Sequence, residues 1–413
     1  MPVYNRIYKD IEEVVNVKTM KLKDGIYWIG SVDHELREFD VVLHAKYGTT
    51  YNSYLVKGSK KTAIIDTVKH TKIDDYLDKL KDLVDIKDVD YIIINHAEPD
   101  HTGSIKKLLE LNKDIIVVGS RAALSNLKEI TNMEFNEFAV SENKTLDLGD
   151  KVFKFISAPN LHWPDTIYSY LETDNVIFTC DSFGSHYGMD IPLQSKITNY
   201  EEYMDGFHYY FEKILLPFKS FMIRAINKIE KLDIDMVCTG HGPILDEDPW
   251  KIINYSKELS LVNKTNSIKE VVIPYVTSYG YTTVLVNKIK EVLENNKIKV
   301  STYDMTYDDL DEVMLALKSC DGVLFGSPTI LGDALFPLWQ ILIRLNPYEQ
   351  GIKKASVFGS YGWSGEGIKH VDERLKQLKY KTIEPFKLKF QPSDDELVEV
   401  EKYALSFVEL LNK

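Results

Sequence analysis

The chain has few cysteines for its length. Only Cys180, Cys238 and Cys320 occur among its 413 residues, and no two of them form a C-x-x-C pair. This scarcity excludes a disulfide framework and a thiolate metal cage. Each cysteine lies in or beside an apolar run, so we expect small buried side chains and a reducing, cytoplasmic compartment.

Long apolar runs are also missing. No stretch approaches the roughly 18 consecutive apolar residues of a membrane-spanning helix, so no membrane span is expected. The start, MPVYNRIYKDIEEV, has no apolar h-region and no cleavage signal, so secretion is not expected. The 50 Lys and Arg residues are outnumbered by 63 Asp and Glu residues, and the net charge of −13 argues against a nucleic-acid partner.

The length predicts two domains, and the composition is that of a globular protein. Up to about Val262, short β runs alternate with loops and a few helices. Several of these runs are apolar nearly throughout, which is typical of strands that are covered on both faces, so we expect two sheets between helices. The predicted strands are 62–67, 91–95, 114–120, 151–159, 175–181 and 235–240, and the predicted helices are 73–84, 103–111 and 201–231.

The last third has a different organisation. A polar stretch, Asn263–Lys269, is predicted to be a linker, which places the domains at 1–264 and 265–413. Beyond it strands and helices alternate, which is typical of right-handed βαβ units in a parallel doubly wound sheet. The predicted strands are 271–276, 298–305, 322–329, 355–362 and 386–390, and the predicted helices start near Thr282 and cover 307–319, 336–344, 366–378 and the C-terminal segment.

The densest chemical signal is a cluster of possible metal ligands after the apolar strand 91–95. His96, Glu98, Asp100 and His101 follow one another within six residues. Burying so many polar groups without partners is expensive, so a packing role is not expected. Strand alternation predicts that His96, Glu98 and Asp100 point the same way and that His101 begins the next turn. One short loop can then supply ligands to two neighbouring ions.

Single candidates elsewhere complete the ligand set, and each of them stands just past a predicted strand. His162 lies in the sequence Leu-His-Trp-Pro-Asp, Asp181 ends the strand 175–181, and His241 lies in Thr-Gly-His-Gly-Pro. An aspartate such as Asp181 can bridge two cations with one oxygen on each. Imidazoles and carboxylates without thiolates suit zinc, manganese or iron, and the high share of carboxylates favours iron.

The order of these residues resembles the metallo-β-lactamase fold and, more specifically, the flavodiiron proteins. The zinc hydrolases of that fold normally have His where this chain has Glu98. The flanking segments Gly48–Leu55, Leu161–Asp165 and Thr239–Pro243 agree with the resemblance. It implies that one iron takes His96, Glu98 and His162, that the other takes Asp100, His101 and His241, and that Asp181 bridges them.

Three loops in the last third suit a flavin mononucleotide (FMN). The first loop has hydroxyls and a glycine at a strand-to-helix turn, where backbone N–H groups can bind a phosphate. In the flavodoxin-like winding the ligand lies above the carboxyl ends of the strands, so the other two loops would flank the flavin ring. These loops resemble the FMN-binding loops of flavodiiron proteins, although Tyr281 stands where flavodoxins usually have a smaller polar residue. Trp363 or Tyr361 is a candidate to stack on the ring. The candidate FMN residues are Thr277, Ser278, Tyr279, Gly280, Tyr281 and Thr282 in the first loop, Ser327, Pro328, Thr329, Ile330 and Leu331 in the second loop, and Ser360, Tyr361, Gly362, Trp363, Ser364 and Gly365 in the third loop.

The remaining histidines carry less weight. His44 precedes the Gly48–Leu55 segment and is a candidate proton donor to the metal pocket. The others show no ligand-like partners and are expected to be surface or core residues: His34, His70, His186, His208 and His370.

The resemblance covers nearly the whole chain. It implies an α/β protein with a metallo-β-lactamase-like αββα sandwich followed by a flavodoxin-like doubly wound parallel sheet. The expected activity is electron transfer from FMN to a di-iron site that reduces dioxygen to water, or nitric oxide to nitrous oxide, and protects an anaerobe. The resemblance further implies a head-to-tail homodimer or a dimer of dimers.

Two alternatives and one open question accompany this hypothesis. A zinc-dependent hydrolase fused to a flavodoxin electron carrier would fit the fold, but Glu98 argues against it. A pure electron-transfer protein with a vestigial metal lobe would not need all seven ligands. The sequence has no C-x-x-C pair for a fused rubredoxin module. The resemblance implies that the electron donor is a separate rubredoxin or, as in methanogens, a reduced deazaflavin coenzyme, which the Phe39-Asp40 stretch favours slightly.

Overall fold

The protein is described here by a computed structural model that covers residues 19–41, 43–261, 268–347 and 351–413. The chain divides into two compact units, Met1–Val262 and Asn263–Lys413, and each is described by itself. The predicted domain boundary between residues 264 and 265 lies outside the described residues.

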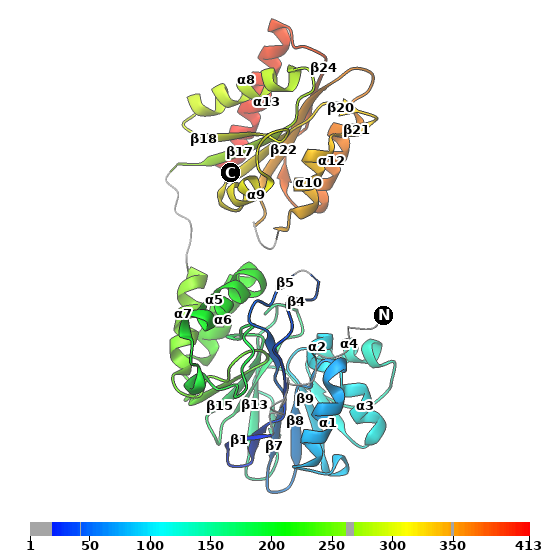
Figure 1. The fold of residues 1–413 in the computed structure, drawn as a ribbon, viewed down its shortest axis with the longest axis vertical. Coiled ribbons are helices and arrows are strands. Elements are labelled where there is room, and N and C mark those ends of the chain that lie inside the picture. The colour runs from blue at the N-terminus through cyan, green and yellow to red at the C-terminus, as the bar shows by residue number, and fades with distance from the viewer. Residues whose placement is uncertain (1–18, 42, 262–267, 348–350) are drawn as a thin grey trace, which may run out of the picture. The chain divides into compact units, whose positions relative to one another are not determined.

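Two sheets form the centre of the first unit (Figure 1). The seven-stranded sheet has the order β1-β2-β7-β8-β9-β10-β11, and the five-stranded sheet has the order β12-β13-β14-β15-β16. Strands β8 to β11 run parallel, so their carboxyl ends meet at one edge. The strands are β1 (Met20–Lys23), β2 (Ile26–Trp28), β7 (Tyr54–Lys57), β8 (Thr62–Ile65), β9 (Tyr91–Ile94), β10 (Ile116–Gly119), β11 (Asn136–Ala139), β12 (Thr145–Asp147), β13 (Val152–Ser157), β14 (Ile167–Leu171), β15 (Val176–Cys180) and β16 (Met236–Thr239).

Two short ribbons lie beside these sheets. Strand β3 (Ser31–Asp33) pairs with β6 (Thr49–Tyr51), and β4 (Glu38–Phe39) pairs with β5 (Leu43–His44). Both ribbons belong to the segment that carries Phe39 and Thr50, two residues that contact the candidate metal ligand His241.

Three hydrophobic clusters hold the first unit together. One lies between the two sheets and contains Phe155. A second packs helices against the seven-stranded sheet and contains Leu108, and a third does the same for the five-stranded sheet and contains Phe207. Burial of apolar surface on both faces of both sheets gives the predicted αββα sandwich. The covering helices are α1 (Ile73–Lys81), α3 (Ile105–Leu111) and α4 (Arg121–Thr131) on one side and α5 (Tyr200–Tyr210), α6 (Lys219–Ile229) and α7 (Pro249–Leu261) on the other.

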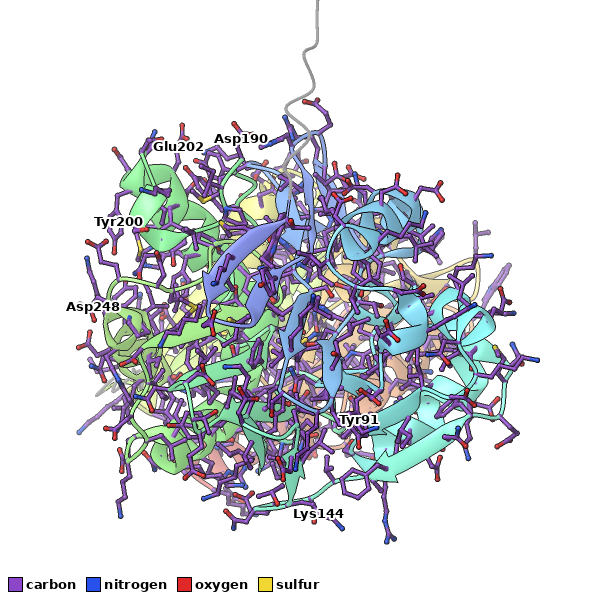
Figure 2. All side chains as sticks on the ribbon, turned by 90° about the horizontal axis from the view of Figure 1, so that it is seen from below. Tyr91, Lys144, Asp190, Tyr200, Glu202 and Asp248 are labelled. Atoms are coloured by element: carbon purple, nitrogen blue, oxygen red, sulfur yellow. The ribbon has the colours of Figure 1, made fainter. Side chains whose placement is uncertain are left out.

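The single helix predicted over 201–231 is wrong. The segment is divided into α5, a π-helical turn at Phe211–Leu215, a 3₁₀ turn at Leu216–Phe218, and α6. Pro217 lies at this break, and proline has no N–H to donate to the preceding helical turn. At the start of α5, Tyr200 and Glu202 are exposed at the outer surface (Figure 2).

The second unit has the predicted parallel sheet. Strands β18 (Lys299–Asp304), β17 (Glu270–Tyr275), β19 (Gly322–Gly326) and β22 (Lys354–Tyr361) are neighbours in this order and run parallel. The fifth strand is divided into β23 (Lys381–Thr382) and β24 (Phe386–Lys389), which both pair with β22. Numbered along the chain, the order is 2-1-3-4-5, which is the flavodoxin-like winding.

Helices cover both faces of this sheet. One cluster contains Leu338 and Val371, and the other contains Leu285 and Phe407. The helices are α8 (Tyr281–Asn295), α9 (Leu310–Ser319), α10 (Phe336–Arg344), α12 (Glu366–Gln377) and α13 (Asp394–Asn412). Across the described residues of both units, we find no helix with the length and apolar character that crossing a membrane requires.

Candidate metal centre and flavin loops

The predicted metal ligands of the first unit stand at the ends of strands. His96 follows β9 by two residues, Asp181 follows β15 directly, and His241 follows β16 by two residues. His162 lies in the loop between β13 and β14. Because these strand ends lie at the same edge, side chains far apart in sequence can meet there.

The loop after β9 does not continue as an extended chain through Asp100, as strand alternation predicted. Pro99 begins a short helix, α2 (Pro99–Thr102), and Glu98 is its extended N-cap residue. The fixed φ of proline suits the first position of a helix. His96 and Glu98 therefore precede the turn, whereas Asp100 and His101 lie within it, and the two pairs belong to different ligand groups.

The first group brings His96, Glu98, His162 and Asp181 together, with one ligand atom of each within 4.8 Å of the others. Oε2 of Glu98 lies 3.0 Å from Nε2 of His96 and 3.0 Å from Nε2 of His162. Oδ2 of Asp181 lies 3.6 Å and 3.3 Å from the same two nitrogens.

The second group consists of Asp100, His101 and His241, again within 4.8 Å of one another. Oδ2 of Asp100 lies 3.0 Å from Nε2 of His241 and 3.4 Å from Nε2 of His101. Here Asp181 presents its other oxygen, because Oδ1 lies 3.0 Å from Nε2 of His101 and 3.5 Å from Nε2 of His241. Asp181 thus faces one group with each oxygen.

These groups are buried, and their electrostatics favour a bound cation. Burial lowers the pKa of His96, but hydrogen bonds to Asp165 and Glu98 and the charge of Asp181 raise it to about 9. Burial also opposes ionisation of Asp181, yet His101 and His162 hold its pKa well below the usual range. Without a cation, imidazolium protons compensate the buried carboxylates. A metal ion would replace those protons.

Two of the histidines are held by an acceptor at their second ring nitrogen. Nδ1 of His96 lies 3.3 Å from Oδ1 of Asp165, whose Oδ2 accepts a 2.7 Å hydrogen bond from the N–H of Ala97. Nδ1 of His241 lies 2.6 Å from the carbonyl oxygen of Thr50. Such partners fix the ring and the tautomer of a metal-binding histidine. The contact between Thr50 and His241 places the Gly48–Leu55 segment beside the candidate metal site.

The first predicted flavin loop is an open helix start. Oγ1 of Thr277 accepts a 3.0 Å hydrogen bond from the N–H of Gly280, which has a φ of +83° and precedes α8. Among the described residues, no side chain caps this helix, and none has a heavy atom within 4 Å of a Cβ added to Gly280. Oγ1 of Thr282 is buried without a hydrogen-bond partner in the described chain. Free N–H groups at a helix start suit a phosphate.

The other two loops meet at the same edge of the sheet. The strand predicted over 322–329 ends at Gly326, and Thr329–Ile330 (β20) forms a hairpin with Asp333–Ala334 (β21). Thr329 pairs with Tyr361 at the end of β22, which brings the second and third loops together. The tips are open to solvent, since Leu331 and Trp363 are both 100% exposed.

Known proteins match both units. Residues 49–242 match the family described as ODP family beta lactamase, and residues 273–403 match the family described as flavodoxin. A flavo-diiron protein of Clostridium acetobutylicum is 38% identical over 394 residues, which cover 94% of this chain and 98% of that protein. This chain belongs to the flavodiiron protein family.

Two further similar proteins are named after an activity. A nitric oxide reductase of Moorella thermoacetica is 32% identical over 88% of this chain and 90% of its own. The solved structure of the rubredoxin oxygen:oxidoreductase of Desulfovibrio gigas shares the fold, with a TM-score of 0.65 and 24% identity over 96% of this chain and 99% of that chain. As a flavodiiron protein, this chain is an oxidoreductase with FMN and a di-iron site as cofactors.

The described residues fit both cofactors of a flavodiiron protein. Seven buried or partly buried residues supply nitrogen and oxygen donors in two adjoining groups. Oδ1 of Asp100 and Oδ2 of Asp181 have no hydrogen-bond partner among the described residues. A pair of iron ions would satisfy these atoms. In the second unit, the buried hydroxyls of Thr282 and Thr329 likewise lack partners in the described part of the chain, and both lie in the predicted FMN loops.

Sequence reasoning missed two side chains beside the metal groups. Tyr210, the last residue of α5, donates a 3.1 Å hydrogen bond to Oδ1 of Asp181. His186 is a core residue, as expected. The centre of its ring lies 5.3 Å from the ring centre of His241 and 4.4 Å from the ring centre of Phe39. Its position five residues after Asp181 was the one available signal.

The other five histidines also belong to neither ligand group. His44 is exposed on β5, and its ring lies 6.3 Å from that of Tyr209. His34, His70 and His208 are exposed, and His370 is half-buried with Nδ1 3.0 Å from Oδ1 of Asp333.

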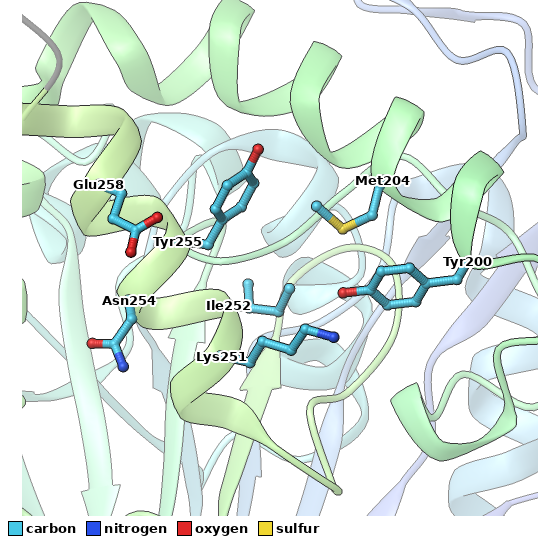
Figure 3. A pocket seen from close by; sticks show the side chains of 7 residues that line it. All are labelled: Tyr200, Met204, Lys251, Ile252, Asn254, Tyr255 and Glu258. Atoms are coloured by element: carbon cyan, nitrogen blue, oxygen red, sulfur yellow. The ribbon is translucent and has the colours of Figure 1, made fainter.

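A surface pocket of about 390 Å³ lies between α5 and α7, lined by Tyr200, Met204, Lys251, Ile252, Asn254, Tyr255 and Glu258 (Figure 3). Nζ of Lys251 stands 4.5 Å from the centre of the Tyr200 ring. None of the lining residues belongs to the metal groups, so this pocket has no part in the di-iron site.

Proposed function

We propose that this flavodiiron protein reduces dioxygen to water with electrons that enter through FMN. The observation that supports this most directly is the position of Asp181, whose two oxygens face two different groups of ligands. A carboxylate in this position suits a bridge between two ions. The overall reaction takes four electrons and four protons for each dioxygen and gives two water molecules.

In the proposed site, His96, Glu98 and His162 would hold one iron, and Asp100, His101 and His241 would hold the other. When bound, the irons supply open coordination positions for a diatomic gas, and FMN supplies electrons singly or in pairs. The surrounding residues exclude bulk water, because the side chains of Asp100, His101, Asp181 and His241 are at most 5% exposed. Glu98 and His162, at 16% and 20%, form the more open side.

We propose that FMN is held by the three loops at the carboxyl edge of the second unit. The open start of α8 would bind the phosphate through its backbone N–H groups. Tyr361 and Trp363 would flank the ring, and Trp363 has the fully exposed side chain that a stacking partner needs. FMN content after Trp363→Ala and after Thr282→Val would test the two contacts separately.

Reduction of nitric oxide to nitrous oxide is the second candidate, supported by the similarity to a protein named nitric oxide reductase. That reaction joins two nitric oxide molecules with two electrons and two protons and releases one water molecule. The proposed donor is a reduced deazaflavin coenzyme or a rubredoxin. Purified protein, assayed with each donor under each gas, would decide both the donor and the preferred gas.

Metal analysis of the purified protein tests whether the first unit binds two irons. We expect two irons per chain and loss of dioxygen uptake in His96→Ala and Glu98→Ala. Two zinc ions with esterase or thiolesterase activity would instead favour the hydrolase alternative. Unchanged uptake in both variants would show that the first unit is not the site of reduction.

We further propose a head-to-tail homodimer, or a dimer of dimers, as the working unit. Exposed apolar side chains near the predicted flavin loops support an interface there: Tyr279 is 83% exposed, Phe336 69%, and Leu331 and Trp363 100%. Sedimentation of the active protein tests this, and a monomer with full turnover would overturn it.

A further inference from the structure

The buried histidines of the metal groups differ at their second ring nitrogen. A histidine that binds a metal almost always donates this N–H to a carboxylate, a carbonyl or a water. His96 has Asp165 for this purpose, and His241 has the carbonyl oxygen of Thr50. Nδ1 of His101 is buried and has no hydrogen-bond partner among the described residues.

The side chain of Cys180 lies beside His101. A ring nitrogen of His101, Sγ of Cys180 and an oxygen of Asp181 all lie within 4.8 Å of one another. Nε2 of His101 already faces Asp181 at 3.0 Å and Asp100 at 3.4 Å. Nδ1 is therefore the nitrogen available to the thiol.

The packing around this pair is tight. A Cβ at Gly240 would lie 2.8 Å from Cε1 of His101 and 3.0 Å from the carbonyl carbon of Cys180. Only a residue without a side chain fits there, so Gly240 can offer His101 no side-chain oxygen. Cys180 and His101 are each 1% exposed.

We propose that a metal bound at Nε2 of His101 leaves the proton on Nδ1, and that the Cys180 thiol then accepts the hydrogen bond from Nδ1–H and tunes this ligand. The inference rests on the proposed role of His101 as an iron ligand. Sulfur is a weak acceptor, whereas the carboxylate of Asp165 behind His96 is a strong one. His101 would then donate less electron density than His96, and the iron on its side would be the more easily reduced of the two. Cys180 is a positioning residue, since it acts through His101.

The test compares Cys180→Ser and Cys180→Ala with the same changes at Cys238. Cys238 is a matched control, because it is also buried, lies on the neighbouring strand β16 and belongs to none of the ligand groups. Ser and Ala keep the Cβ, so the positive φ of +50° at position 180 is no harder to adopt. The readouts are iron content, the midpoint potentials of the two irons from a titration followed by electron paramagnetic resonance, and the rate of iron loss to a chelator.

We expect Cys180→Ser to lower the potential of one iron, because oxygen is the stronger acceptor. Cys180→Ala should raise that potential and speed iron loss roughly tenfold, because loss of the hydrogen-bond partner of a metal ligand weakens metal binding. Wild-type potentials in both Cys180 variants would overturn the inference, and so would equal shifts in the Cys238 variants. A wild-type protein that binds no iron would instead overturn the proposed function.

Discussion

The hydroxyl of Tyr210 donates a 3.1 Å hydrogen bond to Oδ1 of Asp181, the oxygen that also faces His101. The two residues are 1% and 2% exposed. Tyr210 ends a helix of the outer layer, so the helical layer over the five-stranded sheet contributes directly to the site. This contact restrains the carboxylate that lies between the two ligand groups.

Tyr210→Phe should therefore weaken iron binding. A hydrogen bond to a charged group contributes about 1.5–3 kcal/mol, which corresponds to at least roughly a tenfold loss of affinity if the bond acts only in the iron-bound state. Competition with a chelator measures this. Tyr203→Phe is the control, because Tyr203 is buried on the same helix and its hydroxyl has no partner in the described chain. Equal affinities in the two variants would contradict the prediction.

The sequence predicted the candidate site best where polar residues directly follow a buried strand. Apolar runs such as β9 and β15 mark buried strands, and parallel strands end at one edge, so polar residues after them converge. The structure does bring the seven singled-out residues into two adjoining groups. Alternation of strands and helices likewise predicted the parallel sheet of the second unit.

What sequence could not predict depends on contacts between distant segments. Tyr210 and His186 look like ordinary core residues, and only the packing of α5 against the five-stranded sheet brings Tyr210 to Asp181. The turn at Pro99 divided a cluster that strand alternation placed on one face, because helix geometry replaced strand geometry there. The break at Pro217 was readable from proline itself but not from apolar periodicity.

Asp165→Asn should weaken the binding of the iron that His96 is proposed to hold. Oδ1 of Asp165 lies 3.3 Å from Nδ1 of His96, and Oδ2 accepts from the N–H of Ala97, so an amide group cannot replace both oxygens. Loss of such a partner typically costs 10–100-fold in metal affinity. Iron content after dialysis against a chelator is the measurement. Asp205→Asn, at an exposed carboxylate that bonds Tyr47 and Lys46, should leave it unchanged.

The metal-free protein should lose stability in alkali. Despite burial, neighbouring carboxylates raise the pKa of His96 to about 9 and that of His162 to about 10, from 6.5 in the unfolded chain. The folded state thus binds more protons, and its added stability is fully present below pH ~6.5 and is lost as the pH rises through about 9 to 10. We expect Tm to fall over that window without iron. The iron-loaded protein should lack this fall, because iron replaces the protons; a flat metal-free profile would contradict the prediction.

Gly359→Ala should abolish FMN binding by displacing the second flavin loop. A Cβ at Gly359 would come within 1.8 Å of the carbonyl oxygen of Ser327, which is backbone and cannot rotate away. Ser327 would have to move, and with it the Thr329–Ile330 strand that pairs with Tyr361. Overpacking of this kind typically costs 1–3 kcal/mol, so the second unit should still fold while its flavin absorbance is lost.

Gly351→Ala provides the control for this change. Gly351 has a positive φ of +76°, but none of the described residues has a heavy atom within 4 Å of an added Cβ, and Gly351 precedes β22 at the end opposite the flavin loops. Its replacement should cost about 1–2 kcal/mol of stability from backbone strain alone, with full FMN content. If Gly359→Ala also retained FMN, the approach of β22 to Ser327 would not be what shapes the flavin site, and the assignment of the second loop would fail.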